Sequence, residues 1–280
     1  MKIAVVQGGP STEAEVSRAS ARAVVAALQK AGHEAEPVEL DRELAQRLLA
    51  LSPDVVFPVA HGELGEDGCL QGALEVLGLP YVGSGVRAAA IAADKVASKV
   101  FFAQVGLPLA QQAVVTRGDA RLDDVSGLRR ELASVLGEEF ILKPAGGGST
   151  IGIARTLATT SDDEFRRGLD VALELDVTVL VESYHRGREV TCGVLEGDDG
   201  PVALPPTLIH AQASDWYDFQ SKYGSSGSRH ECPAPLPAEW LARIQESAVR
   251  AHRALGARDL SRTDFIVQDD ASFIVLELNN

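Results

Sequence analysis

Residues 262–279 read RTDFIVQDDASFIVLELN, the pattern of two apolar strands joined by a short polar turn. Because side chains alternate between the two faces of a strand, a four-residue turn at 269–272 decides which residues face each other. One face then carries two opposed pairs, Asp264 with Glu277 and Arg262 with Asn279. The other face is expected to face the core and carries mostly apolar side chains: Thr263, Phe265, Val267, Ile274, Leu276 and Leu278.

Two carboxylates that face each other directly, as Asp264 and Glu277 would, repel and destabilise a strand pair. A divalent cation such as Mg²⁺ removes this repulsion, and carboxylate and amide oxygens are the ligands that it prefers. The alternative is a solvated polar face on which two acids are opposed by chance, and a register slip of one residue would separate them. From the hairpin alone, both interpretations stay open.

Toward the N-terminus, strands and helices alternate. Strands are expected at 3–7 and 55–59, and helices at 16–30 and 70–77, before the turn Gly83-Ser84-Gly85. Alternation of strands and helices with short glycine turns predicts an open, parallel α/β layer.

The rest of the chain predicts a mixed arrangement. One long alanine-rich helix is expected from about residue 86 to 105, with Gly106 and Pro108 as its stop signals. Further helices are expected at 122–136, 163–174 and 238–255, and further strands at 113–115, 140–143, 178–182 and 189–195. The proline- and serine-rich stretch 205–237 is expected to be a long excursion, and loops of this length commonly act as lids.

Length and composition restrict the class of protein. The chain has 280 residues, enough for about two domains of ordinary size. Its formal net charge of −14 argues against nucleic acid as a main partner, because binding a phosphate backbone needs clustered Lys and Arg. No apolar run approaches the ~18 residues that predict a membrane span. Three widely spaced cysteines, Cys69, Cys192 and Cys232, predict free thiols in a reducing cytosol.

A glycine-rich loop follows the expected strand that ends at Lys143. Pro144 and Ala145 lead into three consecutive glycines at 146–148. Consecutive glycines allow the backbone to turn its N–H groups toward an anion, and a neighbouring lysine can neutralise a phosphate. The segment is not a Walker A sequence, because the required Gly-Lys-Ser spacing is absent. A tight structural turn is the alternative, so the loop by itself suggests a phosphate site without specifying one.

Other candidates are weaker one by one. Lys95 lies within the expected long helix, where a lysine is most often solvated. Glu182 and Glu189 flank a short loop, and surface acids are the simpler interpretation. His61 lies in an acidic loop punctuated by glycines, after an expected strand. Open α/β sheets bind ligands at such positions, although a turn histidine without function is the simpler alternative.

Taken in order, these segments resemble the D-alanine–D-alanine ligases, which are ATP-grasp enzymes. The resemblance rests on motifs spread over the whole chain: residues 8–17, GGPSTEAEVS; His61 with Glu66-Asp67-Gly68; Gly83-Ser84-Gly85; residues 94–99, DKVASK; Lys143-Pro144 with residues 148–152, GSTIG; Tyr217-Asp218 with Lys222-Tyr223; Cys232-Pro233-Ala234; residues 262–265, RTDF; and residues 276–279, LELN.

The resemblance implies an ATP-grasp fold preceded by a Rossmann-like parallel α/β N-terminal domain. It implies a substrate domain at 1–87, a central subdomain at 88–180 and a C-terminal subdomain at 181–280, with a lid at about 214–231. The implied reaction joins two D-alanines through an acyl phosphate and releases ADP and phosphate, for peptidoglycan precursors. ATP, two Mg²⁺ (or Mn²⁺) ions, D-alanine, a homodimer and a cytoplasmic location are implied with it.

The resemblance also assigns roles to particular residues. They are catalysis by Glu13, Ser149, Tyr223 and Arg262; binding of the first D-alanine by Glu13 and His61; binding of ATP by Lys95, Lys143, Glu182, Glu189 and Lys222; and metal binding by Asp264, Glu277 and Asn279.

Two other functions are alternatives to this one. Another ATP-grasp ligase would join a different acid to an amine or a hydroxy acid, and Tyr223 favours an amine acceptor. A nucleotide-binding regulatory protein would bind ATP but release no ADP on addition of D-alanine. The family pattern continues past Asn279 into a glycine-containing loop and a helix that help to bind the second D-alanine, whereas the sequence ends at Asn280. A segment outside this sequence and an impaired polypeptide both stay open.

Overall fold

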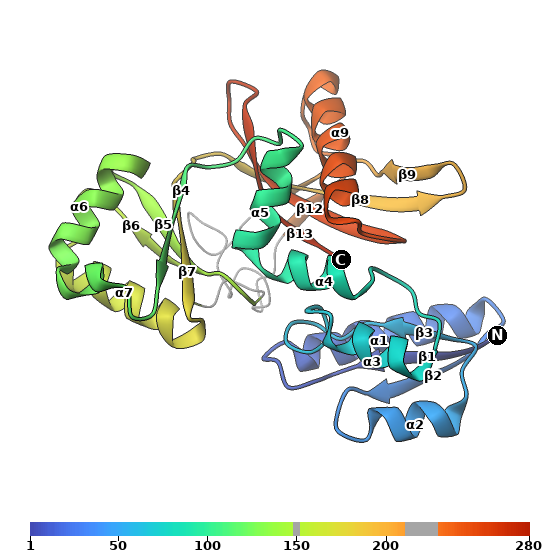
Figure 1. Cartoon of the computed structure of the whole chain (residues 1–280). Helices are drawn as coiled ribbons and strands as arrows, with labels where there is room; N and C mark the ends of the chain where they lie inside the picture. Colours follow the sequence, from blue (N-terminus) through green and yellow to red (C-terminus); the bar gives the residue numbers. More distant parts are fainter. Residues whose placement is uncertain (148–151, 211–228) are drawn as a thin grey trace.

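The computed structural model describes residues 1–147, 152–210 and 229–280. Within these residues the chain forms three β-sheets, each packed against helices (Figure 1). The N-terminal sheet is drawn in blue, the second in green and yellow, and the third mainly in orange and red. The buried apolar clusters follow the same three parts.

The N-terminal sheet is a parallel α/β layer, as the strand–helix alternation predicts. β1 lies in its centre, and β2 and β3 pair with it in parallel. Alternate residues of β1 supply both faces: Ile3 and Val5 pack on the α1 side, whereas Ala4 and Val6 pack on the side of α2 and α3. The elements are β1 (Lys2–Gln7), α1 (Ala14–Lys30), β2 (Glu34–Glu39), α2 (Leu44–Leu51), β3 (Val55–Pro58) and α3 (Cys69–Leu77).

The second sheet is antiparallel and has the strand order β4-β7-β5-β6. Helices α6 and α7 pack against its apolar face, where Phe140 and Phe165 meet edge to face with ring centroids 6.0 Å apart. The elements are β4 (Gln112–Thr116), the 3₁₀ helix η1 (Ala120–Asp123), α6 (Val125–Leu136), β5 (Phe140–Pro144), β6 (Ala154–Thr156), α7 (Asp162–Leu175) and β7 (Thr178–Ser183).

The third sheet has the path β11-β10-β8-β12-β13, and β9 pairs with β8. Helices α9 and α5 pack against it, and Phe102 of α5 is fully buried in the same core as Phe265 of β12. The elements are α5 (Lys95–Gln104), β8 (Arg188–Gly197), β9 (Gly200–Ala203), β10 (Thr207–His210), β11 (Arg229–Glu231), α9 (Ala238–Leu255), β12 (Leu260–Val267) and β13 (Phe273–Asn279).

The single long helix predicted from residue 86 to 105 is wrong, because the structure has α4 (Val86–Ala93) and α5 in its place. Asp94 between them has an extended backbone, and its carboxylate accepts hydrogen bonds of 2.9 and 3.0 Å from two N–H groups in the first turn of α5. This N-cap separates the two helices. Lys95 is therefore the first residue of α5 and not a mid-helix residue.

The terminal hairpin confirms the predicted facing pairs, although the predicted turn is wrong. The observed pairs are Asp264 with Glu277 and Arg262 with Asn279. The loop between the strands has five residues, 268–272, since Val267 pairs with Phe273. The longer loop shifts the register by one residue from Phe265 to Val267. A β-bulge between Asp264 and Phe265 shifts it back, so Asp264 faces Glu277 as predicted.

The bulge changes which residues of β13 face the core. The core cluster contains three residues of this strand, Phe273, Val275 and Leu278. The prediction that Ile274 and Leu276 face the same core is therefore wrong, because alternation is interrupted at the bulge.

The elements that the sequence does not predict are mostly short or polar strands. β10 and β11 lie within 205–237 and pair with each other, so that stretch is not one long excursion. Its middle, residues 211–228, lies outside the described residues, and with it most of the lid predicted at about 214–231. No described helix is long and apolar enough to cross a membrane. The domain division at 87/88 and 180/181 stays a prediction.

Candidate active site

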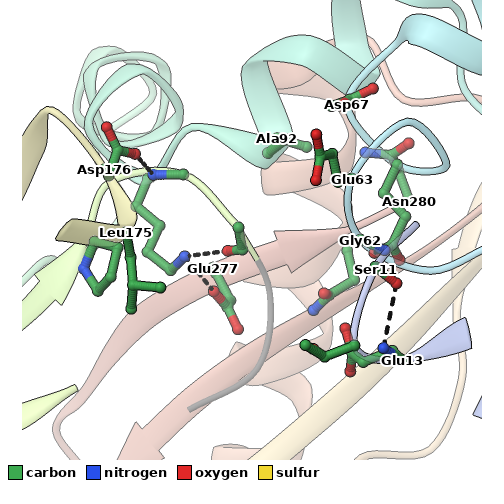
Figure 2. Close-up of a pocket in the computed structure, with 18 of the residues that line it drawn as sticks. Ser11, Glu13, Gly62, Glu63, Asp67, Ala92, Leu175, Asp176, Glu277 and Asn280 are labelled. Atoms are coloured by element: carbon green, nitrogen blue, oxygen red, sulfur yellow. Dashed lines mark hydrogen bonds and ion pairs between the residues drawn. The ribbon is translucent and has the colours of Figure 1, made fainter. Parts of the chain in front are cut away.

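A cavity of about 450 Å³ lies where the N-terminal loops, the glycine-rich loop after β5 and the end of β13 meet (Figure 2). Figure 2 shows Glu13, Asp176 and Glu277 around it, from three different parts of the chain. Lys95 and Asn279 also line this cavity. The cavity thus brings together four residues that the sequence predicts for one site: Glu13, Lys95, Glu277 and Asn279.

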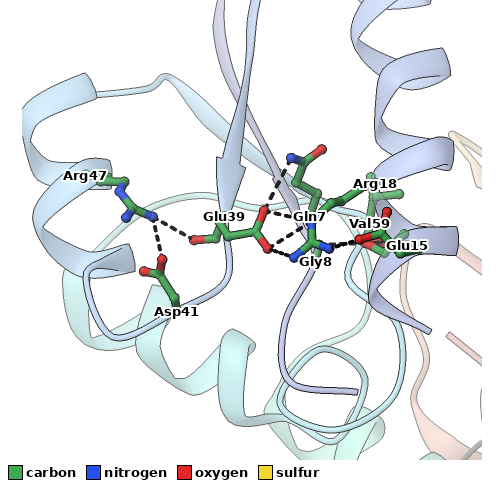
Figure 3. Close-up of polar contacts among 9 residues, drawn as sticks. Gln7, Gly8, Glu15, Arg18, Glu39, Asp41, Arg47 and Val59 are labelled. Carbon is green, nitrogen blue, oxygen red and sulfur yellow. Dashed lines mark hydrogen bonds and ion pairs between the residues drawn. The ribbon is translucent and has the colours of Figure 1, made fainter. Parts of the chain in front are cut away.

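A polar network holds the loop between β1 and α1 (Figure 3). The buried hydroxyl of Ser17 accepts a hydrogen bond from Gly8 N (2.9 Å) and donates one to the carbonyl oxygen of Val59 (2.7 Å). Gly8 has a φ of +74°, and a Cβ at this position would overlap the carboxyl group of Glu39. Glu39 is paired with the guanidinium of Arg18. The left-handed backbone and this overlap therefore both favour glycine at this position.

A second set of contacts joins this loop to the loop after β3. Ser11 Oγ donates a hydrogen bond to the carbonyl oxygen of His61 (2.6 Å) and accepts one from Glu13 N (3.2 Å). The Glu66 carboxylate lies 3.7 Å from His61 Nδ1 and accepts a hydrogen bond from Gly62 N (2.6 Å). Glu66 raises the pKa of His61 above its ordinary value, an effect that burial opposes without cancelling. His61 and Glu13 are therefore carried by loops that are tied to each other.

Lys95 and Asp176 hold the glycine-rich loop. The N–H of Lys95 donates to the carbonyl oxygen of Ala145 (2.8 Å), and its Nζ donates to the carbonyl oxygen of Gly147 (2.7 Å). The Asp176 carboxylate, directly after α7, accepts a hydrogen bond from Gly146 N (2.6 Å). Asp176 is not among the predicted site residues, because nothing in the sequence relates it to the loop 30 positions earlier.

Glu182 on β7 is almost completely buried and lies between two lysines. Its Oε2 accepts a hydrogen bond from Lys143 Nζ (2.7 Å), and its Oε1 lies 2.8 Å from Lys99 Nζ. Burial acts against ionisation of Glu182, but the attraction of Lys143 and Lys99 outweighs it and lowers the pKa to about 2. Burial likewise acts against the charge of Lys143, but Glu182, with smaller contributions from Glu277 and Glu189, raises its pKa. Glu182 and Lys143 are therefore charged at neutral pH, whereas burial lowers the pKa of Lys99, an effect that the attraction of Glu182 opposes.

The carboxylates of Asp264 and Glu277 face each other on β12 and β13, and a cation lies against each. Arg262 donates to Asp264 from Nε (3.1 Å) and Nη2 (3.0 Å), and Lys95 Nζ lies 3.8 Å from Glu277 Oε2. Asn279 Nδ2 donates a further hydrogen bond to Asp264 (3.2 Å). Arg262 and Lys95 thus offset the repulsion between the opposed acids.

The oxygen atoms of Asp264, Glu277 and Asn279 also fit a divalent cation of the Mg²⁺ type as ligands. Mg²⁺ commonly takes one or two carboxylates and completes its ligands with substrate phosphates and water. The Glu277 side chain is 29% exposed and lines the cavity, so it is accessible to such an ion. The described part of the chain has no group of three or more His, Cys, Asp and Glu side chains that suits a metal. Asp264 and Glu277, which face each other, would supply two carboxylate ligands to such an ion.

Three predicted site residues lie outside the described part of the chain, and the structure adds a further residue that was not predicted. Ser149, Lys222 and Tyr223 lie outside the described residues, and their implied roles stay predictions. Lys99 joins the cluster around Glu182 although it is not a predicted site residue. A signal for it exists in the sequence, because its spacing of four from Lys95 places both lysines on one face of a helix.

Comparisons with known proteins agree with this arrangement. Residues 101–280 match the family described as "D-ala D-ala ligase C-terminus", and residues 44–84 match "D-ala D-ala ligase N-terminus". The chain is 39% identical to a D-alanine–D-alanine ligase of Geobacter sulfurreducens over 279 residues, which covers 99% of this chain and 83% of the relative. It is 42% identical to that of Gloeobacter violaceus over 279 residues, with 100% and 88% covered.

Solved structures lead to the same family. The D-alanine–D-alanine ligase of Bacillus anthracis has a TM-score of 0.82 at 31% identity, with 100% of this chain and 86% of that one covered. The VanG D-Ala:D-Ser ligase of Enterococcus faecalis has a TM-score of 0.82 at 28% identity, with 99% and 89% covered. The predicted fold class is confirmed, an ATP-grasp fold preceded by a parallel α/β layer. The chain belongs to the D-alanine–D-alanine ligase family.

Proposed function

We propose that this protein joins two D-alanines into D-alanyl-D-alanine, with conversion of ATP to ADP and phosphate, for peptidoglycan precursors. Its family supports this reaction, and one observation carries it. A single cavity combines a buried carboxylate (Glu13), a lysine beside a glycine-rich loop (Lys95) and an acidic strand end (Glu277). An ATP-dependent ligation of an amino acid needs these three kinds of group, for the amine, the phosphates and a divalent cation.

ATP would be bound by the lysines and by the buried acid between them. Lys95 and Lys143 supply positive charge for the phosphates, and Glu189 would contact the ribose. Oε1 of Glu182 lies 2.8 Å from Lys99 Nζ, and because a carboxylate oxygen has two lone pairs, its second one would accept a hydrogen bond from the amino group of adenine. The low pKa of Glu182, about 2, keeps it an acceptor at neutral pH.

The first step activates a carboxylate, which is a poor electrophile. A carboxylate oxygen of the first D-alanine forms a bond to the γ-phosphorus of ATP, and the bond from that phosphorus to ADP breaks. The products are an acyl phosphate and ADP. Lys95 neutralises charge on the transferring phosphoryl group, and Glu13 holds the ammonium group of the substrate beside His61.

The second step forms the peptide bond. The free amine of the second D-alanine attacks the carbonyl carbon of the acyl phosphate, and the resulting tetrahedral intermediate expels phosphate and loses a proton from nitrogen. Arg262, held by Asp264, is a preorganised donor for the oxyanion of this intermediate. Because an acyl phosphate hydrolyses readily, the cavity must exclude water during this step.

Asp264, Glu277 and Asn279 would hold two Mg²⁺ or Mn²⁺ ions. Divalent cations stabilise the negative charge that develops on a transferring phosphoryl group. Thr191 Oγ1 donates a hydrogen bond to Asp264 (2.6 Å), in addition to the donors from Arg262 and Asn279. These contacts hold the Asp264 carboxylate in one orientation.

Three broader features are part of the proposal. The chain divides into domains at 87/88 and 180/181. It forms a homodimer, which the family resemblance supports and light scattering in solution would test. It works in the cytoplasm, where ATP is available and where its free cysteines, Cys69, Cys192 and Cys232, suit a reducing environment.

The test is release of ADP and phosphate by the purified protein with Mg-ATP and D-alanine, compared with L-alanine, D-serine and D-lactate. Release that requires D-alanine, with dipeptide formed in equal amount, is the expected result. Release with another acceptor in preference to D-alanine would favour a different ligase of the same fold. ATP binding without release of ADP on addition of D-alanine would favour a nucleotide-binding regulatory protein.

A further inference from the structure

Lys99 of α5 has a side chain with 0% exposure, which is uncommon for a lysine. Its Nζ lies 2.8 Å from Oε1 of Glu182 on β7 and donates a hydrogen bond to the carbonyl oxygen of Val275 on β13 (3.3 Å). One ammonium group therefore connects the second and third sheets beside the candidate ATP site.

Two ammonium groups contact the one carboxylate of Glu182. Its side chain is 3% exposed and contacts two ammonium groups, Lys99 and Lys143, with side-chain exposures of 0% and 11%. One lysine would be enough to neutralise one carboxylate. A second buried cation is unfavourable unless it has a further role, because each ion taken out of water loses hydration. Glu277 also favours the charged forms of both lysines, and Glu189 that of Lys143, but their contributions are smaller than that of Glu182.

We propose that Lys99 is a positioning residue for the nucleotide: it holds Glu182 ionised and in place when Lys143 turns from Glu182 to the phosphates of ATP. The inference rests on the proposed function, in which Lys143 binds phosphate and Glu182 accepts a hydrogen bond from adenine. The Lys99 side chain has no exposed surface, so it would act on the nucleotide through Glu182 and not by direct contact.

Loss of the Lys99 charge should have different effects in the nucleotide-free and the nucleotide-bound protein. Without nucleotide, Lys143 by itself pairs with Glu182, so Lys99→Met, a change to an uncharged side chain of similar length, should still fold. With nucleotide bound, the same variant would leave a buried carboxylate without a cation, which is strongly unfavourable. The variant should therefore lose affinity for nucleotide. It should keep its affinity for D-alanine, whose proposed contacts Glu13 and His61 lie on the N-terminal loops.

The experiment measures binding of Mg-ADP by calorimetry to wild type, Lys99→Met, Glu182→Gln and the double variant. Lys99→Met should weaken binding by about tenfold or more, the size expected when a contact to a charged group is lost. It should raise the KM for ATP in parallel and leave the KM for D-alanine unchanged. In the Glu182→Gln background, Lys99→Met should cause no further loss, because no carboxylate remains to be held. Lys30→Met, on the exposed end of α1, is the matched control and should change nothing.

Two results would overturn the proposal: unchanged Mg-ADP binding in Lys99→Met, or an equal loss in the presence and absence of the Glu182 carboxylate. If Lys99→Met does not fold, Lys99→Gln makes the same comparison, since it keeps a donor for Val275 and removes only the charge. Binding of Mg-ADP is measured without ligation. A wild-type protein that binds Mg-ADP but does not ligate D-alanine would therefore refute the proposed function and leave the role of Lys99 to be decided by the binding data.

Discussion

Replacement of Gly8 by alanine should destabilise the protein more than the same change at Gly32. Both glycines have a left-handed backbone, with φ of +74° and +87°. A residue with a Cβ costs about 1–2 kcal/mol in that region. At Gly32 nothing lies within 4 Å of the added Cβ, so no further cost arises. At Gly8 the added Cβ overlaps the Glu39 carboxyl group, and relieving such an overlap costs a further ~1–3 kcal/mol.

The difference between the two variants in free energy of unfolding is therefore expected to be about 1–3 kcal/mol. Glu39 is able to move away, but movement breaks its pair with Arg18 and its hydrogen bond from Gln7. Urea denaturation followed by far-UV circular dichroism measures this difference. Tryptophan fluorescence is unsuitable, because Trp216 and Trp240 both lie in the C-terminal half of the chain.

A functional difference should accompany the difference in stability. Gly8 N is anchored to Ser17, within the loop that carries Glu13, so Gly8→Ala should raise the KM for D-alanine. Gly32→Ala should leave this KM unchanged. Equal destabilisation by the two variants, within about 0.5 kcal/mol, would show that Glu39 yields without cost and would refute the reasoning.

Three further predictions concern the site itself. Asp264→Asn keeps the shape of the side chain but removes the charge that holds Arg262, so kcat should fall by about a hundredfold or more. Chelation of divalent cations should abolish ligation by the wild type. Addition of Mg²⁺ should then restore ligation by the wild type but not by the variant. Asp176→Ala removes the acceptor for Gly146 N, so the KM for ATP should rise about five- to tenfold, whereas Asp163→Ala, at an exposed position of the preceding helix α7, should have no effect on it. Glu66 raises the pKa of His61, so the stability that His61 contributes is fully present below its ordinary pKa of 6.5 and is lost as pH rises through the raised value. The difference in unfolding free energy between wild type and His61→Gln should therefore decline above pH 6.5, and a difference independent of pH would contradict the assignment.

The terminal hairpin shows how far a local pattern reaches. Alternation of polar and apolar residues predicts that Asp264 faces Glu277, and the structure confirms it. The five-residue loop and the β-bulge are not predicted, because a bulge is stabilised by packing of the whole sheet and leaves no periodic signal of its own. The two deviations cancel at the acidic pair, so the prediction was correct there and wrong for Ile274 and Leu276.

Other differences between prediction and structure also have local causes. The helix break at Asp94 has a signal, since aspartate is a favoured N-cap, but alanine-rich segments on both sides favour one continuous helix. β2 has the polar sequence EAEPVE and is held in the sheet by pairing with β1. β6 and β11 have only three residues each, too few for a period to be recognised.

By itself, the sequence determined the alternation of strands and helices, the glycine-rich loop after Lys143 and the ordered motifs that indicate the family, because these depend on residue type and short spacing. Only the tertiary structure decided that Lys99 and Lys143 share Glu182, and that Asp176 holds the glycine-rich loop. Such contacts join residues that are far apart in the chain; Lys99 and Val275, for example, are separated by 176 positions. Their geometry follows from how the three sheets pack together, and no local period of the sequence encodes that packing.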